Sequence, residues 1–223
     1  MSHRLIVIIF LAGAAIFVLS GCAASDTGEK TEMVEENAMD KQVEEPVVEE
    51  VEEAVTEKAD KVGGNGFILR VNCGSYESCT DKAGNVWLSD QDMEDGRKWG
   101  AVGGLISDRS GLNVTGTDAP VIYQTERYSM DTYKFIVPNG KYTVRLHFAE
   151  TYEGIYGEGE RVFSVTINDM KALTDFDPYK EAGGHDKPIV KEFTVDVTGE
   201  EILIKFIPNI ENPEINGIEI LSK

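Results

Sequence analysis

Apolar and polar residues alternate in two long runs between positions 121 and 163, and Pro138-Asn139-Gly140 joins the runs. The second run carries an apolar residue at every other position: Tyr142, Val144, Leu146 and Phe148. A period of two is typical of a strand with one face in a core and the other in solvent. Tyrosines stand at the outer ends of both runs: Tyr123, Tyr128, Tyr152 and Tyr156. We therefore predict a β-hairpin that presents an aromatic surface on the loops at one end of a sheet.

Shorter stretches of the same alternation occur on both sides of this central pair. They occupy residues 67–71, 162–167, 189–197, 202–207 and 215–221. Glycine, proline and asparagine separate them; we expect no long helix in the domain and a loop with one helical turn within residues 175–184. Short strands at this spacing predict an all-β domain, an antiparallel β-sandwich of the jelly-roll kind, over residues 67–223. A domain of that length can bury a core of its own.

Two segments before the central pair are interpreted as irregular. Residues 81–90 predict a turn in which Asp81 and Asn85 bond to nearby backbone groups. Residues 99–104 are rich in glycine and predict a loop, but they lack the Lys-Ser/Thr of a phosphate-binding loop. Regular strand context assigns three aromatic residues to the core: Trp87, Tyr142 and Phe148. Tyr123 and Tyr133 fit either the core or a binding surface.

The N-terminus has the features of a lipoprotein export signal, in the expected order. A short basic start at Arg4 precedes an apolar run over residues 5–19, and Leu19-Ser20-Gly21-Cys22 resembles the lipobox of bacterial lipoproteins. We predict a signal peptide over residues 1–21 and lipid attachment at Cys22, with an uncleaved signal anchor as the alternative. Membrane association is then through the lipid alone. The expected location is a bacterial cell envelope, and Ala23 favours the outer membrane or cell surface.

Residues 22–66 form a strongly acidic segment between this signal and the domain. Residues 26–61 hold 14 Asp and Glu against 4 Lys, a net charge of −10 out of −19 for the whole chain. Such a stretch buries too little apolar surface to offset the entropy of ordering it, so we expect a disordered, self-repelling linker. Valines at positions 47, 48, 51 and 55 leave a short helix as the alternative. The acidic balance of the chain argues against a nucleic-acid partner.

The cysteines of the domain, Cys73 and Cys79, are close in sequence. An exported protein meets an oxidising space, so we predict a disulfide between them. No second pair of Cys or His stands at the spacing of a zinc site, and the histidines are scattered along the chain. The sequence therefore predicts no metal site and no cofactor.

Several motifs follow one another along the predicted domain. They are Val71-Asn72-Cys73-Gly74, residues 81–90, Gly103-Gly104, residues 122–128 (I-Y-Q-T-E-R-Y), residues 147–152 (H-F-A-E-T-Y), residues 161–168 and Asn212-Pro213. In this order they resemble malectin and the malectin-like carbohydrate-binding modules, over about residues 68–221. The resemblance implies a β-sandwich that binds glucose-containing oligosaccharides.

The resemblance also implies which residues meet the sugar. The family's binding tyrosine in T-E-R-Y corresponds to Tyr128, and an aromatic residue before a glycine corresponds to Trp99. The pair after F-A-E corresponds to Tyr152 and Glu153, and the acidic residue before N-P corresponds to Glu211. Glu153 stands where the family has an aromatic residue, and Glu211 is one methylene longer than the usual Asp. Specificity for the family's diglucoside is therefore not expected to carry over unchanged.

Charged residues next to the proposed ligand residues are interpreted as follows. Adjacent Glu126 and Arg127 form either an internal ion pair that fixes the position of Tyr128 or a pair of ligand contacts. Glu150 is expected to bond to the backbone at the end of its strand.

These residue types suit a sugar ring. A flat aromatic side chain covers the apolar face of a pyranose, and a carboxylate accepts hydrogen bonds from its hydroxyls. The leading hypothesis is a surface lipoprotein that binds a glucan-type oligosaccharide without catalysis. A glycoside hydrolase using two of Glu150, Glu153 and Glu211 is the second hypothesis. A protein-interaction or structural module of the envelope that keeps the fold without binding sugar is the third.

Overall fold

The computed structural model describes residues 66–223. The predicted signal peptide, the lipid-attachment residue Cys22 and all of the acidic linker except Gly66 lie outside the described residues. Within the described part, no helix has the length and apolarity that a membrane span requires.

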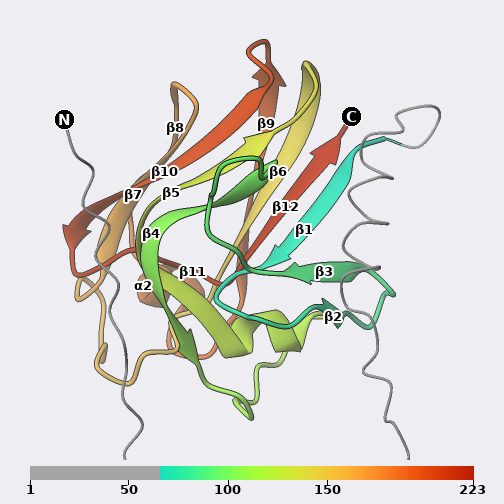
Figure 1. Ribbon diagram of the computed structural model, residues 1–223. Helices are drawn as coiled ribbons and strands as arrows, with labels where there is room; N and C mark the ends of the chain where they lie inside the picture. The colour runs from blue at the N-terminus through green and yellow to red at the C-terminus, as the bar shows by residue number, and fades with distance from the viewer. Residues whose placement is uncertain (1–65) are drawn as a thin grey trace, which may run out of the picture. The chain divides into compact units, whose positions relative to one another are not determined.

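The described chain folds into two facing β-sheets (Figure 1). Sheet I contains β1 (Ile68–Asn72), β2 (Cys79–Thr80), β3 (Val86–Ser89), β6 (Gly140–Phe148), β9 (Ile189–Val197) and β12 (Gly217–Ser222). Sheet II contains β4 (Trp99–Asp108), β5 (Thr125–Ile136), β7 (Val162–Ile167), β8 (Met170–Phe176), β10 (Glu201–Ile210) and β11 (Glu214–Ile215). A 3-10 turn, η1 (Pro120–Gln124), and one short helix, α2 (Pro178–Ala182), complete the elements. The predicted all-β sandwich and its single helical turn are confirmed.

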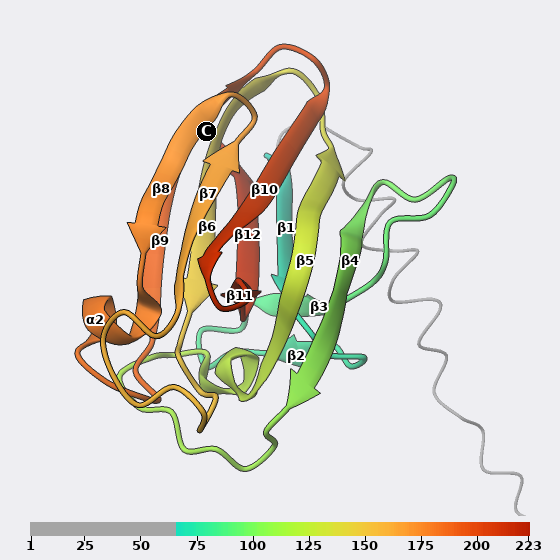
Figure 2. The ribbon, with the colours of Figure 1, turned by 90° about the vertical axis from the view of Figure 1, so that its left-hand side faces the viewer.

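The core lies between the sheets, as the alternation predicts. Figure 2 shows sheet II in front of sheet I, and side chains from both sheets form one apolar cluster. Leu146 and Ile218 enter it from sheet I, and Phe135 and Ile204 enter it from sheet II. The three aromatic residues that the sequence assigned to the core are buried: Trp87, Tyr142 and Phe148. Tyr123 and Tyr133, which fitted either the core or a binding surface, are buried as well.

The predicted β-hairpin around Pro138-Asn139-Gly140 is wrong. β5 pairs with β4, β10 and β11, whereas β6 pairs with β12 and β9. The segment between β5 and β6 therefore carries the chain from one sheet to the other, and the Tyr142 hydroxyl donates to the Pro138 carbonyl (2.8 Å) across the crossing. Alternation identifies the buried face of each strand, but two strands that face the same core from opposite sheets have the same pattern as two neighbours in one sheet.

The glycine-rich segment at residues 99–104 is also not a loop. It is the first half of β4, a ten-residue strand that pairs with β5. The register shifts between Val102 and Gly103, where Gly103 and Gly104 take φ of 72° and 90°. A bulge of this kind needs left-handed backbone, which glycine adopts without steric cost. The glycines therefore mark a bulge inside a strand.

The predicted disulfide between Cys73 and Cys79 is not formed, because both cysteines are free. Cys73 is fully buried in the main core between the sheets. Cys79 is half-buried in β2 and packs against a separate apolar cluster that contains Trp87 and Ile122. Closeness in sequence does not bring the two thiols together, since each belongs to a different cluster.

Unreduced protein should therefore contain two free thiols in the domain. Burial raises the pKa of the Cys73 thiol well above its usual range, so native protein should alkylate at Cys79 first and at Cys73 only on unfolding. Peptide mapping of full-length protein, alkylated with and without denaturant, measures both rates. A Cys73–Cys79 disulfide peptide in the unreduced digest would contradict the structure.

Candidate functional site

A pocket of about 230 Å³ lies beside the C-terminal end of β4. Figure 2 shows this strand end at the bottom of the sandwich. Strand β5 contributes Tyr128, the loop after β6 contributes Tyr152, and the turn between β10 and β11 contributes Glu211. The rest of its lining is Ser107, Arg109, Glu126, Arg161 and Asn212. The structure thus brings three of the five predicted ligand residues together from separate segments.

A larger cavity of about 930 Å³ adjoins this pocket. Both cavities are lined by Ser107, Arg109 and Tyr152, so Tyr152 stands at their boundary. Glu153 lines the larger cavity and not the smaller one. Tyr156 lines it as well. We call the smaller cavity the first pocket and the larger one the second pocket.

Trp99 does not reach either pocket. It begins β4, is only 6% exposed, and stacks on Phe135 with ring centroids 6.3 Å apart. Ser107, which does line the first pocket, lies eight residues further along the strand, roughly 26 Å away at the rise of an extended chain. The prediction placed Trp99 in a loop, and its position at the far end of a long strand is the reason that this assignment is wrong.

Buried charged residues form the floor of the first pocket. Arg161, at 3% exposure, donates to the carboxylate of Glu150 (2.6 Å) and also to the carbonyl of Asn212. Glu150 accepts from the backbone N–H of Tyr152 as well (3.0 Å). The expected backbone bond of Glu150 is thus confirmed, and Arg161 connects its carboxylate to the turn after β10.

Of the two interpretations of Glu126 and Arg127, the ion pair between them is wrong, because successive residues of a strand point to opposite faces. Arg127 points toward sheet I, where its guanidinium binds Asp90 (2.7 Å) and Asp92 (2.9 Å). Glu126 points toward the first pocket, where it lies 3.2 Å from Arg109. Tyr128 shares the face of Glu126 and therefore also reaches the pocket.

Glu214 lies directly across the β5–β11 ladder from Tyr128 and is fully buried. Within residues 66–223, neither of its carboxylate oxygens has a hydrogen-bond partner. Burial raises the pKa of Glu214 well above its usual range, and the nearby carboxylates of Glu126 and Glu150 raise it further. The protonated form is favoured because an unpaired buried carboxylate loses its hydration without compensation.

The rim of the two pockets contains backbone in an uncommon conformation. Ser129, Asp186 and Glu211 have positive φ (59°, 57° and 59°), which side chains other than glycine seldom adopt. The N–H of Ser129 donates to the carbonyl of Pro213 (3.0 Å), so β5 holds the turn that carries Glu211. Strain of this kind is retained at functional sites when the surrounding structure fixes it.

Sequence reasoning did not identify Arg109, Arg161 or Asn212 as lining residues. Arg109 places its guanidinium carbon 6.0 Å from the ring centroid of Tyr152, at the edge of cation–π distance. The H-F-A-E-T-Y and R-V-F motifs contain Glu150 and Arg161. The sequence shows that these two motifs carry opposite charges, but it does not show that Glu150 and Arg161 pair.

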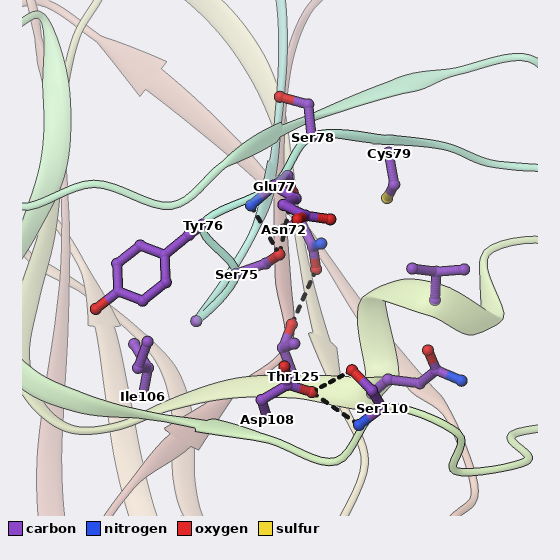
Figure 3. Close-up of a pocket in the computed structure, with 13 residues that line it drawn as sticks. Asn72, Ser75, Tyr76, Glu77, Ser78, Cys79, Ile106, Asp108, Ser110 and Thr125 are labelled. Atoms are coloured by element: carbon purple, nitrogen blue, oxygen red, sulfur yellow. Dashed lines mark hydrogen bonds between the residues drawn. The ribbon is translucent and has the colours of Figure 1, made fainter. Parts of the chain in front are cut away.

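A third cavity, of about 380 Å³, shares Asp108 and Ser110 with the second pocket (Figure 3). Figure 3 shows Ser75 and Glu77 on one side of it, Asp108 and Ser110 on the other, and Tyr76 at one end near Ile106. None of the five predicted ligand residues lines it.

Known proteins share this domain. A model of the malectin domain family matches residues 67–218. Receptor-like protein 4 of Arabidopsis thaliana is 34% identical over 190 residues, 74% of this chain and 30% of the relative. Malectin of Mus musculus is 30% identical over 118 residues, 46% of this chain and 40% of the relative.

Two solved structures resemble the fold at low sequence identity. A β-glucuronidase of Bacteroides uniformis superposes with a TM-score of 0.63 at 26% identity, over 70% of this chain and 18% of the enzyme. The plant receptor-like kinase FER superposes with a TM-score of 0.56 at 26% identity, over 70% of this chain and 42% of that chain. The match therefore spans less than half the length of each of these four proteins.

The buried carboxyl of Glu214 should make stability depend on pH. Its pKa is raised on folding, so the native state holds a proton that the unfolded chain releases above pH 4.5. Above that pH the native state loses stability as pH rises, by up to about 1.4 kcal/mol per unit for one proton. Glu214→Gln cannot ionise, so its stability relative to wild type should increase with pH over that window.

Urea unfolding of both proteins at pH 5, 6, 7 and 8 measures this difference. Glu153→Gln makes the same chemical change at an exposed position and controls for the substitution itself. A difference between Glu214→Gln and wild type that stays constant across the series would show that Glu214 does not bind the proton.

Proposed function

The chain belongs to the malectin domain family, and from this premise we propose that it binds a glucose-containing oligosaccharide or polysaccharide without transforming it, as a lipid-anchored protein of a bacterial cell envelope. The observation that carries the proposal is the convergence of Tyr128, Tyr152 and Glu211 on one pocket. The three residues come from different segments, so the fold is what assembles them.

The chemistry of the first pocket matches that of a sugar. Tyr128 and Tyr152 supply flat rings for the apolar face of a pyranose, and each ring has a hydroxyl at its edge. Glu211 accepts hydrogen bonds and Arg109 donates them, so hydroxyls of either orientation find partners. A ligand without hydroxyls would leave these groups unpaired, at a cost in binding free energy.

The placement of the carboxylates supports binding over hydrolysis. A glycoside hydrolase needs two carboxyl groups that face each other across the scissile bond. Glu150 is fully buried and bound to Arg161, so it does not meet a ligand. Glu153 and Glu211 are exposed but line different pockets. Glu126 lines the first pocket with Glu211, but it is 2% exposed and paired with Arg109.

A module that binds protein in place of sugar is the alternative, and the free edge of β4 favours it. β4 pairs along its length with β5 on one side, and the second half of its other edge has no strand partner in the described residues. Leu105 is 61% exposed there. Unpaired strand edges accept an added strand from another chain.

Tyr128→Ala should weaken glycan binding about tenfold or more, since it removes a stacking face from the first pocket. Calorimetry with the malto-, laminari- and cello-oligosaccharides measures the affinities. Tyr128→Phe keeps the ring and should lose less. The absence of binding to any glucan, galactan or host glycan would overturn the proposal, and a protein partner captured equally by wild type and Tyr128→Ala would favour the alternative.

The proposed lipid attachment at Cys22 can be tested separately from sugar binding. Cys22→Ser removes the thiol that accepts the lipid, so in a bacterial host this variant should lose incorporation of labelled fatty acid and move to the soluble fraction. Cys79→Ser is the matched control, because it changes a cysteine of the domain and should leave membrane association unchanged. Firm membrane binding by Cys22→Ser would contradict the lipoprotein assignment.

A further inference from the structure

The first pocket is too small for a complete oligosaccharide. Its volume of about 230 Å³ lies below the range of roughly 300–1,000 Å³ typical of ligand sites, whereas the second pocket holds about 930 Å³. The two cavities share Ser107, Arg109 and Tyr152. A ligand seated against Tyr128 can therefore continue past Tyr152 into the second pocket.

The second pocket offers a further aromatic ring to such a ligand. Tyr156 lines it and is 77% exposed, so its ring contributes little to the core. The loop beneath the ring is nevertheless fixed. Ile155 is only 4% exposed, its N–H donates to the carbonyl of Tyr152 (3.0 Å), and a ring nitrogen of His185 binds its carbonyl.

The carboxylate of Glu160 holds the same loop from the other side. It accepts from the backbone N–H groups of Tyr156 (2.5 Å) and Gly157 (3.2 Å). An exposed ring on a backbone that is already ordered loses little conformational entropy when a ligand binds. This arrangement is what a stacking platform requires.

Polar groups around Tyr156 complete the second pocket. Glu153 and Asp186 offer carboxylate acceptors, and Arg109 and Ser110 offer donors. The backbone N–H of Asp186 donates to the carbonyl of Glu150 (2.9 Å), which ties this residue to the floor of the first pocket. A ring bordered by donors and acceptors fits a hydroxyl-rich chain better than an apolar one.

We propose that the site takes a glycan longer than a disaccharide, with its first units in the first pocket and the following units in the second pocket against Tyr156. This inference rests on the proposed function and adds the class of ligand: an oligosaccharide or a polysaccharide segment. Tyr152, at the boundary, contacts both parts of the chain.

The test is the dependence of affinity on chain length. Full-length protein is titrated by calorimetry with the disaccharide through the hexasaccharide of each malto-, laminari- and cello- series. Wild type should gain about fivefold or more in affinity beyond the disaccharide. Tyr156→Ala should lose that gain and keep the disaccharide affinity within about twofold, because only the longer chains reach the second pocket.

Tyr76→Ala is the matched control. Tyr76 is 82% exposed and lines the third cavity, so this variant should follow wild type at every chain length. Thermal unfolding checks that both variants fold, and Tyr156→Phe, which keeps the ring, should retain the gain with length.

Three results would overturn the inference. They are equal affinity of wild type for all chain lengths, a loss in Tyr156→Ala that is the same at every length, and the same behaviour in Tyr76→Ala as in Tyr156→Ala. Each of them leaves sugar binding in the first pocket intact. The absence of binding to every sugar would instead overturn the proposed function together with this inference.

Discussion

The site depends on one buried ion pair, between Glu150 at the end of β6 and Arg161 before β7. Its members are 0% and 3% exposed, and Arg161 also binds the carbonyl of Asn212. The pair therefore fixes the loop that carries Tyr152 and the turn that carries Glu211 relative to each other. Removal of either partner would leave an uncompensated charge in the interior, which is costly to stability.

The charges around this pair explain why an unpartnered acid is tolerated beneath a pocket. Three carboxyl groups, those of Glu126, Glu150 and Glu214, share the site with the guanidinium groups of Arg109 and Arg161. The two arginines balance two carboxylates, and a protonated Glu214 makes the whole cluster neutral. Burial raises the pKa of both Glu126 and Glu214. Glu126 is bound by Arg109 and Thr151, whereas Glu214 has no hydrogen-bond partner among the described residues, so a proton is favoured on Glu214.

The alternation of apolar and polar residues predicted the features that depend on a single strand. Alternation identified the buried faces of β6 and β7 correctly, because burial of one face is a property of a single strand. Pairing is not such a property, so the pattern predicts a hairpin at residues 138–140, where the chain crosses between the sheets. It likewise predicts a loop at Gly103, where the structure has a bulge in β4. Family motifs located Tyr128, Tyr152 and Glu211, but they misplaced Trp99. The sequence did not identify Arg109 and Arg161 as pocket residues, because their role arises only when separate segments of the chain meet.

The structure suggests a physical role for Glu153, a position at which this sequence departs from the pattern expected of the family. The resemblance to the family implies an aromatic residue at the position of Glu153, and therefore the loss of a stacking surface. In the fold, the side chain of Glu153 borders the second pocket, where Tyr156 supplies a ring three residues later. The substitution thus leaves the rings of the first pocket in place and adds an acceptor beside another ring. Because loops fixed by buried residues such as Ile155 carry these side chains, ligand preference can change without disturbing the sheets behind them.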